Sequence, residues 1–266
     1  MVRDLQPRLL GRTVARVEAP WPGSVVWPSF DEFVRRLTGR EIRGVSRRGK
    51  YALVALDSRD TLIVHRGMTG SLLLRERDDP MEAHVRLRLE LDDGGEVRFN
   101  DPRKFGKVFL MEAGGTERPL PWSRMGPEPL NGHFSPASLK DALRGRKGLI
   151  KPLLLNQRIV AGLGNIYVDE ALYRARIHPL KRAGALTPPE VARLHGAIRD
   201  VLTEAVEGRG TTFSSYTDIE GRAGNFQRSL QVFHRAGEAC PRCGQTIRRL
   251  VVGGRGTHIC PGCQEL

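Results

Sequence analysis

The chain has 266 residues and a formal net charge of +13, from 43 Lys and Arg against 30 Asp and Glu. This length is enough for two domains and a small appendage. No apolar run is long enough for a membrane span or a signal peptide, so the sequence predicts a cytoplasmic protein without membrane association. The basic excess favours nucleic acid as the partner over an acidic membrane surface.

The first half of the chain is typical of antiparallel β-structure. From His84 to Leu91, apolar and charged residues alternate, as in a strand with one buried face. The Asp-Asp-Gly-Gly sequence at 92–95 predicts a hairpin turn into a strand at 97–99. Further short apolar runs lie at 12–18, 51–56, 61–65 and 70–75. Together these strands predict a β-sandwich, with one helix over 30–37.

The composition becomes helical after a linker rich in Pro and Gly at 117–129. Ser135 and Pro136 suit the N-cap and first position of a helix that runs to Leu143. Thr187 and Pro188 open another helix. Its predicted apolar face consists of Val191, Leu194, Ile198, Val201, Leu202 and Val206.

The stretch from Lys151 to Leu172 combines an apolar run, a polar break at Asn156 and Gln157, and a turn with Gly162 and Gly164. A helical pattern follows from Asn165, with Ile166, Val168, Leu172 and Tyr173 on one side and Asp169 and Glu170 opposite. Free N–H groups and the positive dipole end at a helix start favour an anion. Residues 142–182 carry nine Lys or Arg and two Asp or Glu, so we expect this turn to bind a phosphate backbone.

All four cysteines lie in the last 27 residues, as Cys240-Pro-Arg-Cys243 and Cys260-Pro-Gly-Cys263, with sixteen residues between the pairs. Two such pairs can complete a tetrahedron of thiolates around one Zn²⁺. Four protein ligands leave no open position, so the predicted zinc is structural. A redox-active cysteine pair is the alternative, and it would need only one of the two motifs.

Several motifs together resemble the formamidopyrimidine-DNA glycosylases, bacterial enzymes that excise oxidised purines. The matching stretches are Arg-Arg-Gly-Lys-Tyr (47–51), His-Arg-Gly-Met-Thr-Gly-Ser-Leu (65–72), Asp-Pro-Arg-Lys-Phe-Gly (101–106), Met-Gly-Pro-Glu-Pro-Leu (125–130), Ala-Gly-Leu-Gly-Asn-Ile-Tyr (161–167) and Arg-Gly-Thr-His-Ile-Cys (255–260). The resemblance implies an α+β multidomain fold. Its parts are an N-terminal antiparallel β-sandwich at 1–122, a helix–two-turn–helix domain at 123–228 and a four-cysteine zinc finger at 229–266.

The resemblance also implies a function and a partner. The function is base-excision repair by a bifunctional DNA glycosylase and abasic-site lyase, which acts by β,δ-elimination. The partner is double-stranded DNA with oxidised bases or abasic sites, bound by a monomer.

The resemblance implies roles for individual residues. Lys50 resembles the lysine that contacts a phosphate beside the damaged nucleotide and assists catalysis. Asn165 and Arg255 resemble the pair that grips the flanking phosphates, and we count Arg255 with the catalytic residues. The trio Met68, Arg103 and Phe105 resembles the side chains that fill the gap left by a flipped base. Further expected DNA contacts are His84, Lys104, Lys147, Lys151 and Gly164, and residues 217–227 resemble the mobile loop that closes over the everted base.

Two features depart from the family pattern. The family begins Pro-Glu-Leu-Pro-Glu, and the free amine of the proline attacks the deoxyribose carbon. This chain begins Met-Val-Arg-Asp-Leu, so we expect the family nucleophile in a segment upstream of the given start. Glu82 stands where the family usually has a phosphate-contacting histidine, and a carboxylate there is expected to repel phosphate.

Two other functions fit the same sequence. One is a protein that recognises damaged DNA without cutting it. The other is an endonuclease-VIII-like glycosylase for oxidised pyrimidines, against which the trio of Met68, Arg103 and Phe105 argues.

Overall fold

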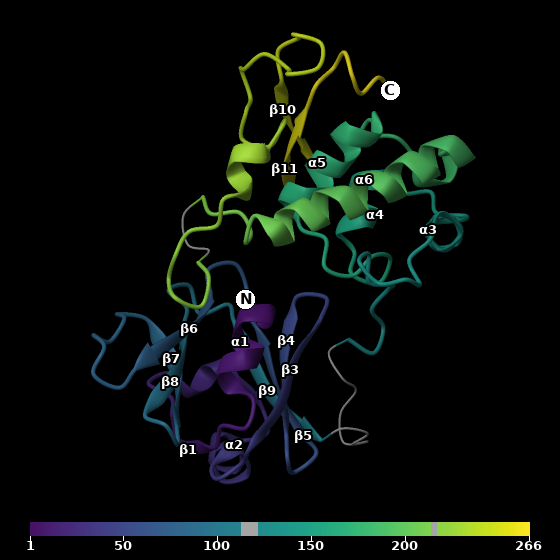
Figure 1. The fold of residues 1–266 in the computed structure, drawn as a ribbon. Coiled ribbons are helices and arrows are strands. Elements are labelled where there is room, and N and C mark those ends of the chain that lie inside the picture. Colours follow the sequence, from purple (N-terminus) through teal and green to yellow (C-terminus); the bar gives the residue numbers. More distant parts are fainter. Residues whose placement is uncertain (113–121, 214–216) are drawn as a thin grey trace. The chain divides into compact units, whose positions relative to one another are not determined.

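In the computed structural model, the described residues are 1–112, 122–213 and 217–266, and they divide into two units. The N-terminal unit combines Met1–Ser123 with Arg209–Asn225, and the C-terminal unit combines Arg124–Gly208 with Phe226–Leu266 (Figure 1). The expected linker at 117–129 lies partly outside the described residues. The division into domains at 1–122, 123–228 and 229–266 stays a prediction.

The N-terminal unit is built on two β-sheets (Figure 1). The first is antiparallel and has the order β1 (Val14–Glu18), β7 (Val85–Leu91), β8 (Gly95–Asn100), β6 (Ser71–Glu76). The second has the order β2 (Val25–Trp27), β9 (Lys107–Glu112), β5 (Asp60–His65), β4 (Tyr51–Leu56), β3 (Ile42–Arg48). In the second sheet β2 runs parallel to β9, and the other pairs are antiparallel. The predicted β-sandwich is confirmed.

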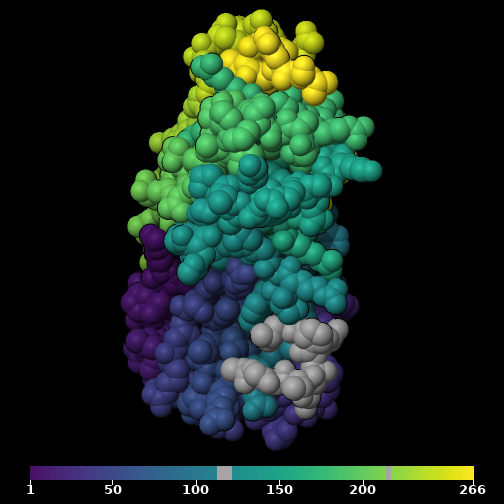
Figure 2. Space-filling model, turned by 90° about the vertical axis from the view of Figure 1, so that its right-hand side faces the viewer, coloured from purple at the N-terminus to yellow at the C-terminus, as the bar shows by residue number. Residues whose placement is uncertain are grey.

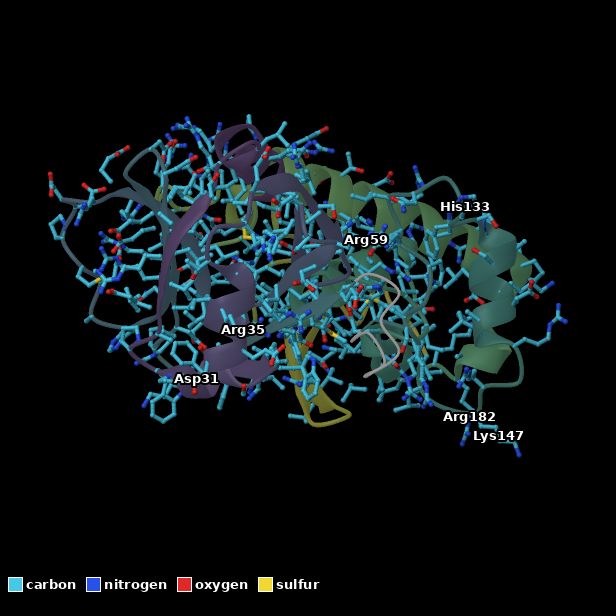
Figure 3. All side chains as sticks on the ribbon, turned by 90° about the horizontal axis from the view of Figure 1, so that it is seen from below. Asp31, Arg35, Arg59, His133, Lys147 and Arg182 are labelled. Atoms are coloured by element: carbon cyan, nitrogen blue, oxygen red, sulfur yellow. The ribbon has the colours of Figure 1, made fainter. Side chains whose placement is uncertain are left out.

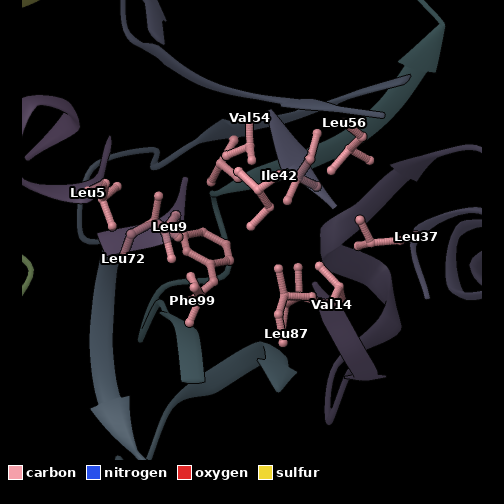
Figure 4. Close-up of a pocket in the computed structure, with 14 residues that line it drawn as sticks. Leu5, Leu9, Val14, Leu37, Ile42, Val54, Leu56, Leu72, Leu87 and Phe99 are labelled. Carbon is pink, nitrogen blue, oxygen red and sulfur yellow. The ribbon is translucent and has the colours of Figure 1, made fainter. Parts of the chain in front are cut away.

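The core of this unit lies between the two sheets. Along β7 the apolar residues are buried at every second position, which matches the predicted alternation. Two helices add apolar side chains to the core, Leu5 and Leu9 from α1 (Val2–Leu9) and Phe33 and Leu37 from α2 (Phe30–Leu37). Figure 4 shows a small apolar cavity that Leu5, Leu9 and Leu37 line together with side chains of the strands.

The predicted helix over 30–37 is α2, and Ser29 caps it by accepting a hydrogen bond from the N–H of Glu32. Sequence periodicity missed α1, β2, β3 and β9. Three of these four segments carry charged residues among their apolar positions, and β2 has only three residues. A sheet neighbour or the core, rather than local pattern, selects their structure.

The C-terminal unit contains the helices α3 (Pro136–Leu143), α4 (Ile150–Leu155), α5 (Asn165–Ala175) and α6 (Pro188–Glu207). They are followed by the hairpin of β10 (Arg248–Val252) and β11 (Arg255–Ile259). Among the described residues there are also three short 3₁₀ helices, at Pro22–Ser24, Ala183–Ala185 and Phe226–Ser229. Ser135 and Thr187 begin α3 and α6 with capping boxes, each followed by proline, as predicted.

Two predictions about helix faces are wrong. On α6, Val206 is 43% exposed although Ala205 in the same turn is buried, because Val206 lies to the side of the buried stripe. On α5, Tyr173 lies one turn after Asp169 and therefore on the same side of the helix rather than opposite it, and Asp169 and Glu170 are both buried. Among the residues that the structure describes, no helix has the length and apolar character that crossing a membrane requires.

Candidate functional site

Lys50 lies in the two-residue turn between β3 and β4, where Arg48 pairs with Tyr51 across the hairpin. Gly49 takes a φ of 54°, a left-handed conformation that suits glycine and lets the turn close. The side chain of Lys50 is exposed. The turn therefore places this side chain at the surface of the protein, as a phosphate contact requires.

His65 lies directly across from Tyr51 in the neighbouring strand β5, with the two ring centroids 4.9 Å apart. Burial lowers the pKa of His65, and the positive charges of Lys50 and Arg66 lower that pKa further. The neutral ring accepts a hydrogen bond at Nδ1 from the N–H of Gly67, at 3.2 Å. This bond fixes the start of the turn that carries Met68.

Met68 and Phe105, which would be core residues by composition, are 64% and 51% exposed. They stand on two turns that touch each other. A Cβ added to Gly67, whose φ is 64°, would lie 2.9 Å from the backbone carbon of Phe105. Because glycine alone permits both this φ and this approach, the two turns that carry the exposed apolar side chains are held close together.

A buried carboxylate locks these two turns together. Asp101 has no exposed surface, and its Oδ1 accepts a hydrogen bond of 2.5 Å from the Oγ1 of Thr69, beside Met68. Its Oδ2 accepts one of 2.7 Å from the N–H of Gly106, beside Phe105. Its own N–H donates to the carbonyl oxygen of His84. The structure thus brings the predicted trio and the exposed His84 into one assembly, and sequence analysis missed Asp101 as its centre.

Two cation–π contacts orient the cations of the 101–106 loop. The guanidinium carbon of Arg103 lies 4.7 Å from the ring centroid of Phe105. Lys104 takes a left-handed φ of 59°, and its Nζ lies 3.8 Å from the ring centroid of Trp21. Both cations remain exposed. Trp21 was not predicted to belong to this surface, because it lies more than eighty positions earlier in the sequence.

Glu82 is not the repulsive charge that the sequence suggested. Its Oε1 accepts from Nε of Arg75 at 2.7 Å, and its Oε2 accepts from Nη1 of Arg98 at 3.3 Å. Arg98 has no exposed surface and also donates to the carbonyl oxygens of Glu76, Asp79 and Pro80. The carboxylate is used to hold the segment before His84 in place, and two arginines neutralise it.

The predicted mobile loop at 217–227 is described from residue 217 onward, and residues 214–216 lie outside the described part. Ile219 is buried in the core of the N-terminal unit, and its carbonyl oxygen accepts a 2.8 Å hydrogen bond from the N–H of Leu74 on the edge strand β6. Asp218 is also buried and accepts the N–H groups of Glu220 and Arg222. This first part of the segment is thus docked on the first sheet, whereas Phe226 lies in the core of the C-terminal unit. The mobility of the segment stays a prediction.

In the C-terminal unit, the turn between α4 and α5 is braced by Gln157. Its Nε2 donates to the carbonyl oxygens of Leu155 and Leu163, and its Oε1 accepts the N–H of Gly162. Gly164 then serves as the N-cap of α5, and the helix begins at Asn165. The predicted turn and helix start are confirmed, but Gln157 was read only as a polar interruption.

Asn165 joins the start of α5 to the tip of the β10–β11 hairpin. Its Nδ2 donates a 2.9 Å hydrogen bond to the carbonyl oxygen of Gly256, directly after the exposed Arg255. The structure therefore brings together the two residues that were predicted to grip phosphates. The helix N-terminus adds its dipole to the charge of Arg255.

The prediction that Lys151 contacts DNA is wrong, because the side chain has no exposed surface. Its Nζ donates to Oδ1 of Asp169 at 2.5 Å, to Oγ1 of Thr257 at 2.7 Å and to the carbonyl oxygen of Gly256 at 3.0 Å. Burial lowers the pKa of Lys151, and Asp169 opposes that shift. Lys151 thus acts from beneath the surface, by fixing the backbone next to Arg255.

Lys147 contrasts with Lys151, since its side chain is exposed. Figure 3 shows Lys147 and Arg182 together at the edge of the molecule, with both side chains extending away from the ribbon. Nη1 of Arg182 donates to the carbonyl oxygen of Lys147 at 3.1 Å. The position of Lys147 is thus compatible with the DNA contact that the sequence predicts.

Helix α5 contacts the C-terminal tail along its whole length. Besides Asn165, Asp169 accepts the N–H of His258 on β11 at 2.9 Å. Glu170 accepts the N–H groups of Gln231, Val232 and Phe233, and burial raises the pKa of this carboxyl against the opposing effect of those three bonds. The buried polar residues of α5 are therefore the docking site for the tail, which explains why they do not face solvent.

The four cysteine sulfurs fit one zinc ion. One sulfur from each cysteine forms a group in which all lie within 4.8 Å of one another, and all four cysteines are free of disulfides. Cys240 and Cys263 are 3.9 Å apart at Sγ, and Cys243 and Cys260 are 3.3 Å apart. A tetrahedral zinc with Zn–S bonds of about 2.3 Å requires S···S distances of about 3.8 Å. Figure 2 shows the C-terminal end of the chain, in yellow, packed against the yellow-green residues that precede it.

Removing the buried ammonium tests the role of Lys151. Lys151→Met leaves the carboxylate of Asp169 buried without its cation, so we expect a loss of about 3 kcal/mol in the free energy of unfolding. Lys147→Met, four residues earlier and exposed, is the matched control and should change that free energy by less than about 0.5 kcal/mol. Chemical denaturation of the zinc-loaded protein measures both, and equal effects of the two variants would contradict the assignment.

The contact between His65 and Gly67 predicts a pH dependence. The folded-state pKa of His65 is lowered below that of the unfolded chain, so its contribution to stability is present above about pH 6.5 and is lost as the pH falls. His65→Asn retains an acceptor but cannot be protonated. The variant should lose less stability than the wild type between pH 7 and pH 5 in thermal denaturation, and an identical loss in both proteins would show that His65 is not responsible.

Three family models match this chain in order. Residues 1–108 match the formamidopyrimidine-DNA glycosylase N-terminal domain, residues 125–217 match the H2TH domain of the same enzyme, and residues 237–266 match a zinc finger found in FPG and IleRS. Together with the sulfur geometry, the third match confirms the prediction of one structural zinc.

Curated relatives and solved structures agree with these matches. The formamidopyrimidine-DNA glycosylase of Symbiobacterium thermophilum is 50% identical over 264 residues, which cover 99% of this chain and 86% of the relative. That of a Roseiflexus species is 46% identical and covers 98% of this chain and 96% of the relative. A structure of Lactococcus lactis Fpg with DNA that contains an abasic site has a TM-score of 0.92 at 38% identity, and the match covers 100% of this chain and 97% of the other. The chain therefore belongs to the formamidopyrimidine-DNA glycosylase family.

Proposed function

We propose that this protein acts in base-excision repair as a DNA glycosylase and abasic-site lyase. Its proposed substrates are oxidised purines, 8-oxoguanine and formamidopyrimidines, in double-stranded DNA, and it nicks the abasic product by β,δ-elimination. One chain acts as a monomer on one duplex. The family membership supports this function, and solved relatives from Lactococcus lactis are described in complex with DNA that contains Fapy-dG or an abasic site.

The observation that carries the proposal is the pair of exposed apolar side chains on turns that Asp101 locks together. Exposing Met68 and Phe105 has no benefit for the fold, whereas apolar wedges are used to unstack bases and to occupy the space of a flipped nucleotide. Arg103 lies over Phe105 and presents planar donors that suit the base left without a partner. The assembly is therefore suited to holding a duplex open at a damaged base.

Three further groups, one in the N-terminal unit and two in the C-terminal unit, are suited to contacts with DNA phosphates. Lys50 presents an ammonium at the tip of its hairpin, and Asn165 and Arg255 lie together at the start of α5. An ordinary lysine is protonated at neutral pH, so Lys50 supplies charge rather than a nucleophilic amine. In the family the nucleophile is the amine of an N-terminal proline, a group that can form a Schiff base with an opened sugar.

Borohydride trapping on a duplex with one 8-oxoguanine opposite cytosine tests this function. Residues 1–266 are compared with the same chain preceded by Pro-Glu-Leu-Pro-Glu and freed of its initiator methionine. We expect both forms to bind abasic-site DNA with an affinity that falls steeply with salt. Only the form with the proline amine should give a trapped Schiff base, base excision and strand cleavage.

Each other outcome has a clear meaning. Strong trapping by residues 1–266 alone would show that another amine is the nucleophile. Binding by both forms without excision by either would favour the alternative, a protein that recognises damaged DNA but does not cut it. Excision of an oxidised pyrimidine in preference to 8-oxoguanine would favour the endonuclease-VIII-like alternative.

A further inference from the structure

A tyrosine outside the four-cysteine group contacts one of its sulfurs. The hydroxyl of Tyr173 on α5 lies 3.3 Å from Sγ of Cys240. Both residues are almost fully buried, at 1% and 3% exposure, and belong to the same small apolar cluster, so solvent does not compete for the contact. The N–H of Arg242 donates to the same sulfur at 3.4 Å.

The side chain of Arg242 holds Tyr173 in this position. Its guanidinium carbon lies 4.5 Å from the centroid of the tyrosine ring, and its Nη1 donates to the carbonyl oxygen of Tyr173 at 3.2 Å. Arg242 lies between Cys240 and Cys243 in the first cysteine pair. This pair therefore contacts Tyr173 twice, at the ring through Arg242 and at the hydroxyl through Cys240.

The direction of the hydrogen bond follows from the chemistry of the metal site. A cysteine that ligates zinc is a thiolate, which can accept a hydrogen bond but has no proton to donate. With zinc bound, the hydroxyl of Tyr173 must therefore be the donor. Four thiolates around one Zn²⁺ carry a net charge of −2, and the Cys240 thiolate is buried, so a donor that withdraws charge from this sulfur stabilises the site.

We propose that Tyr173 is a positioning residue for the zinc ion, which donates a hydrogen bond to the thiolate of Cys240 and thereby slows release of the metal. Asn165 and Asp169, which lie eight and four positions earlier on the same helix, also form hydrogen bonds with the tail. Each of these three residues binds a different part of the tail. The metal is thus coupled to the helix whose first residue is the proposed phosphate contact.

Tyr173→Phe is the test, because it keeps the aromatic ring and removes only the hydroxyl. Outer-shell hydrogen bonds typically change metal affinity by 10- to 100-fold, so zinc release to an excess of a chromophoric chelator should become about tenfold faster. Tyr167→Phe is the matched control: it removes a hydroxyl from the same helix, where the ring packs against Phe226 at 5.8 Å. Release from this control should stay at the wild-type rate.

Cobalt substitution provides a readout that a general loosening of the fold would not reproduce. A thiolate without its hydrogen bond donates charge to Co²⁺ more readily, so the sulfur-to-cobalt charge-transfer band of Tyr173→Phe should move to lower energy. The band of Tyr167→Phe should not move. Wild-type release kinetics together with an unshifted band in Tyr173→Phe would overturn the proposal, as would equal acceleration in the two variants.

A third measurement uses the wild-type protein and does not depend on how the variants fold. With cadmium in place of zinc, the hydroxyl proton of Tyr173 should show scalar coupling to the metal nucleus through the sulfur of Cys240. Detection of this coupling by NMR would support the hydrogen bond directly. A tyrosine hydroxyl signal that exchanges slowly but lacks the coupling would contradict it.

Discussion

The carboxylate of Asp169 is the contact on which the C-terminal unit depends. It is fully buried, and its two oxygens bind two different parts of the unit, the ammonium of Lys151 from α4 and the N–H of His258 from β11. A buried charge with one partner is costly, but here both oxygens and the ammonium are satisfied. Through Lys151 the same group fixes the carbonyl of Gly256, and thereby the backbone that carries Arg255.

The N-terminal unit is also organised around one buried carboxylate. Asp101 is buried, and its oxygens bind the turn of Met68 on one side and the turn of Phe105 on the other. In both units an internal carboxylate determines where exposed side chains stand, and the exposed side chains are those that we propose to contact DNA. Loss of either carboxylate would leave the exposed residues present but without a fixed geometry.

The sequence predicted the parts of this molecule that depend on local rules. The alternation in β7, the capped starts of α3 and α6, the turn before α5 and the paired cysteines all follow from patterns within a few residues. The exposed Met68 and Phe105 were predicted only through the family resemblance, because composition alone would place them in the core. Lys151, Glu82 and Asp169 were misread for one shared reason. Lys151 and Asp169 pair with each other, and Asp169 also accepts from His258. Glu82 pairs with Arg75 and Arg98. All but one of these partners lie more than ten positions away in the sequence, and no local pattern shows whether a charge is solvated or paired internally.

One signal for the C-terminal unit was present in the sequence and was not used. Asn165, Asp169 and Tyr173 recur every four positions, so they form a polar line on a helix whose other residues are mostly apolar. Such a line on a buried helix indicates a docked partner segment rather than a solvated face. The partner here is the zinc-binding tail, which is too small to have a core of its own.

We infer that α5 and the zinc-binding tail form one cooperative structure. Native-state hydrogen exchange of the intact chain, measured with zinc bound and after chelation, tests it most directly. Removing zinc should lower the protection of amides in β11 and in α5 together, including the first turn of α5 after Asn165. Loss of protection confined to the tail, with α5 unchanged, would show that the two fold independently.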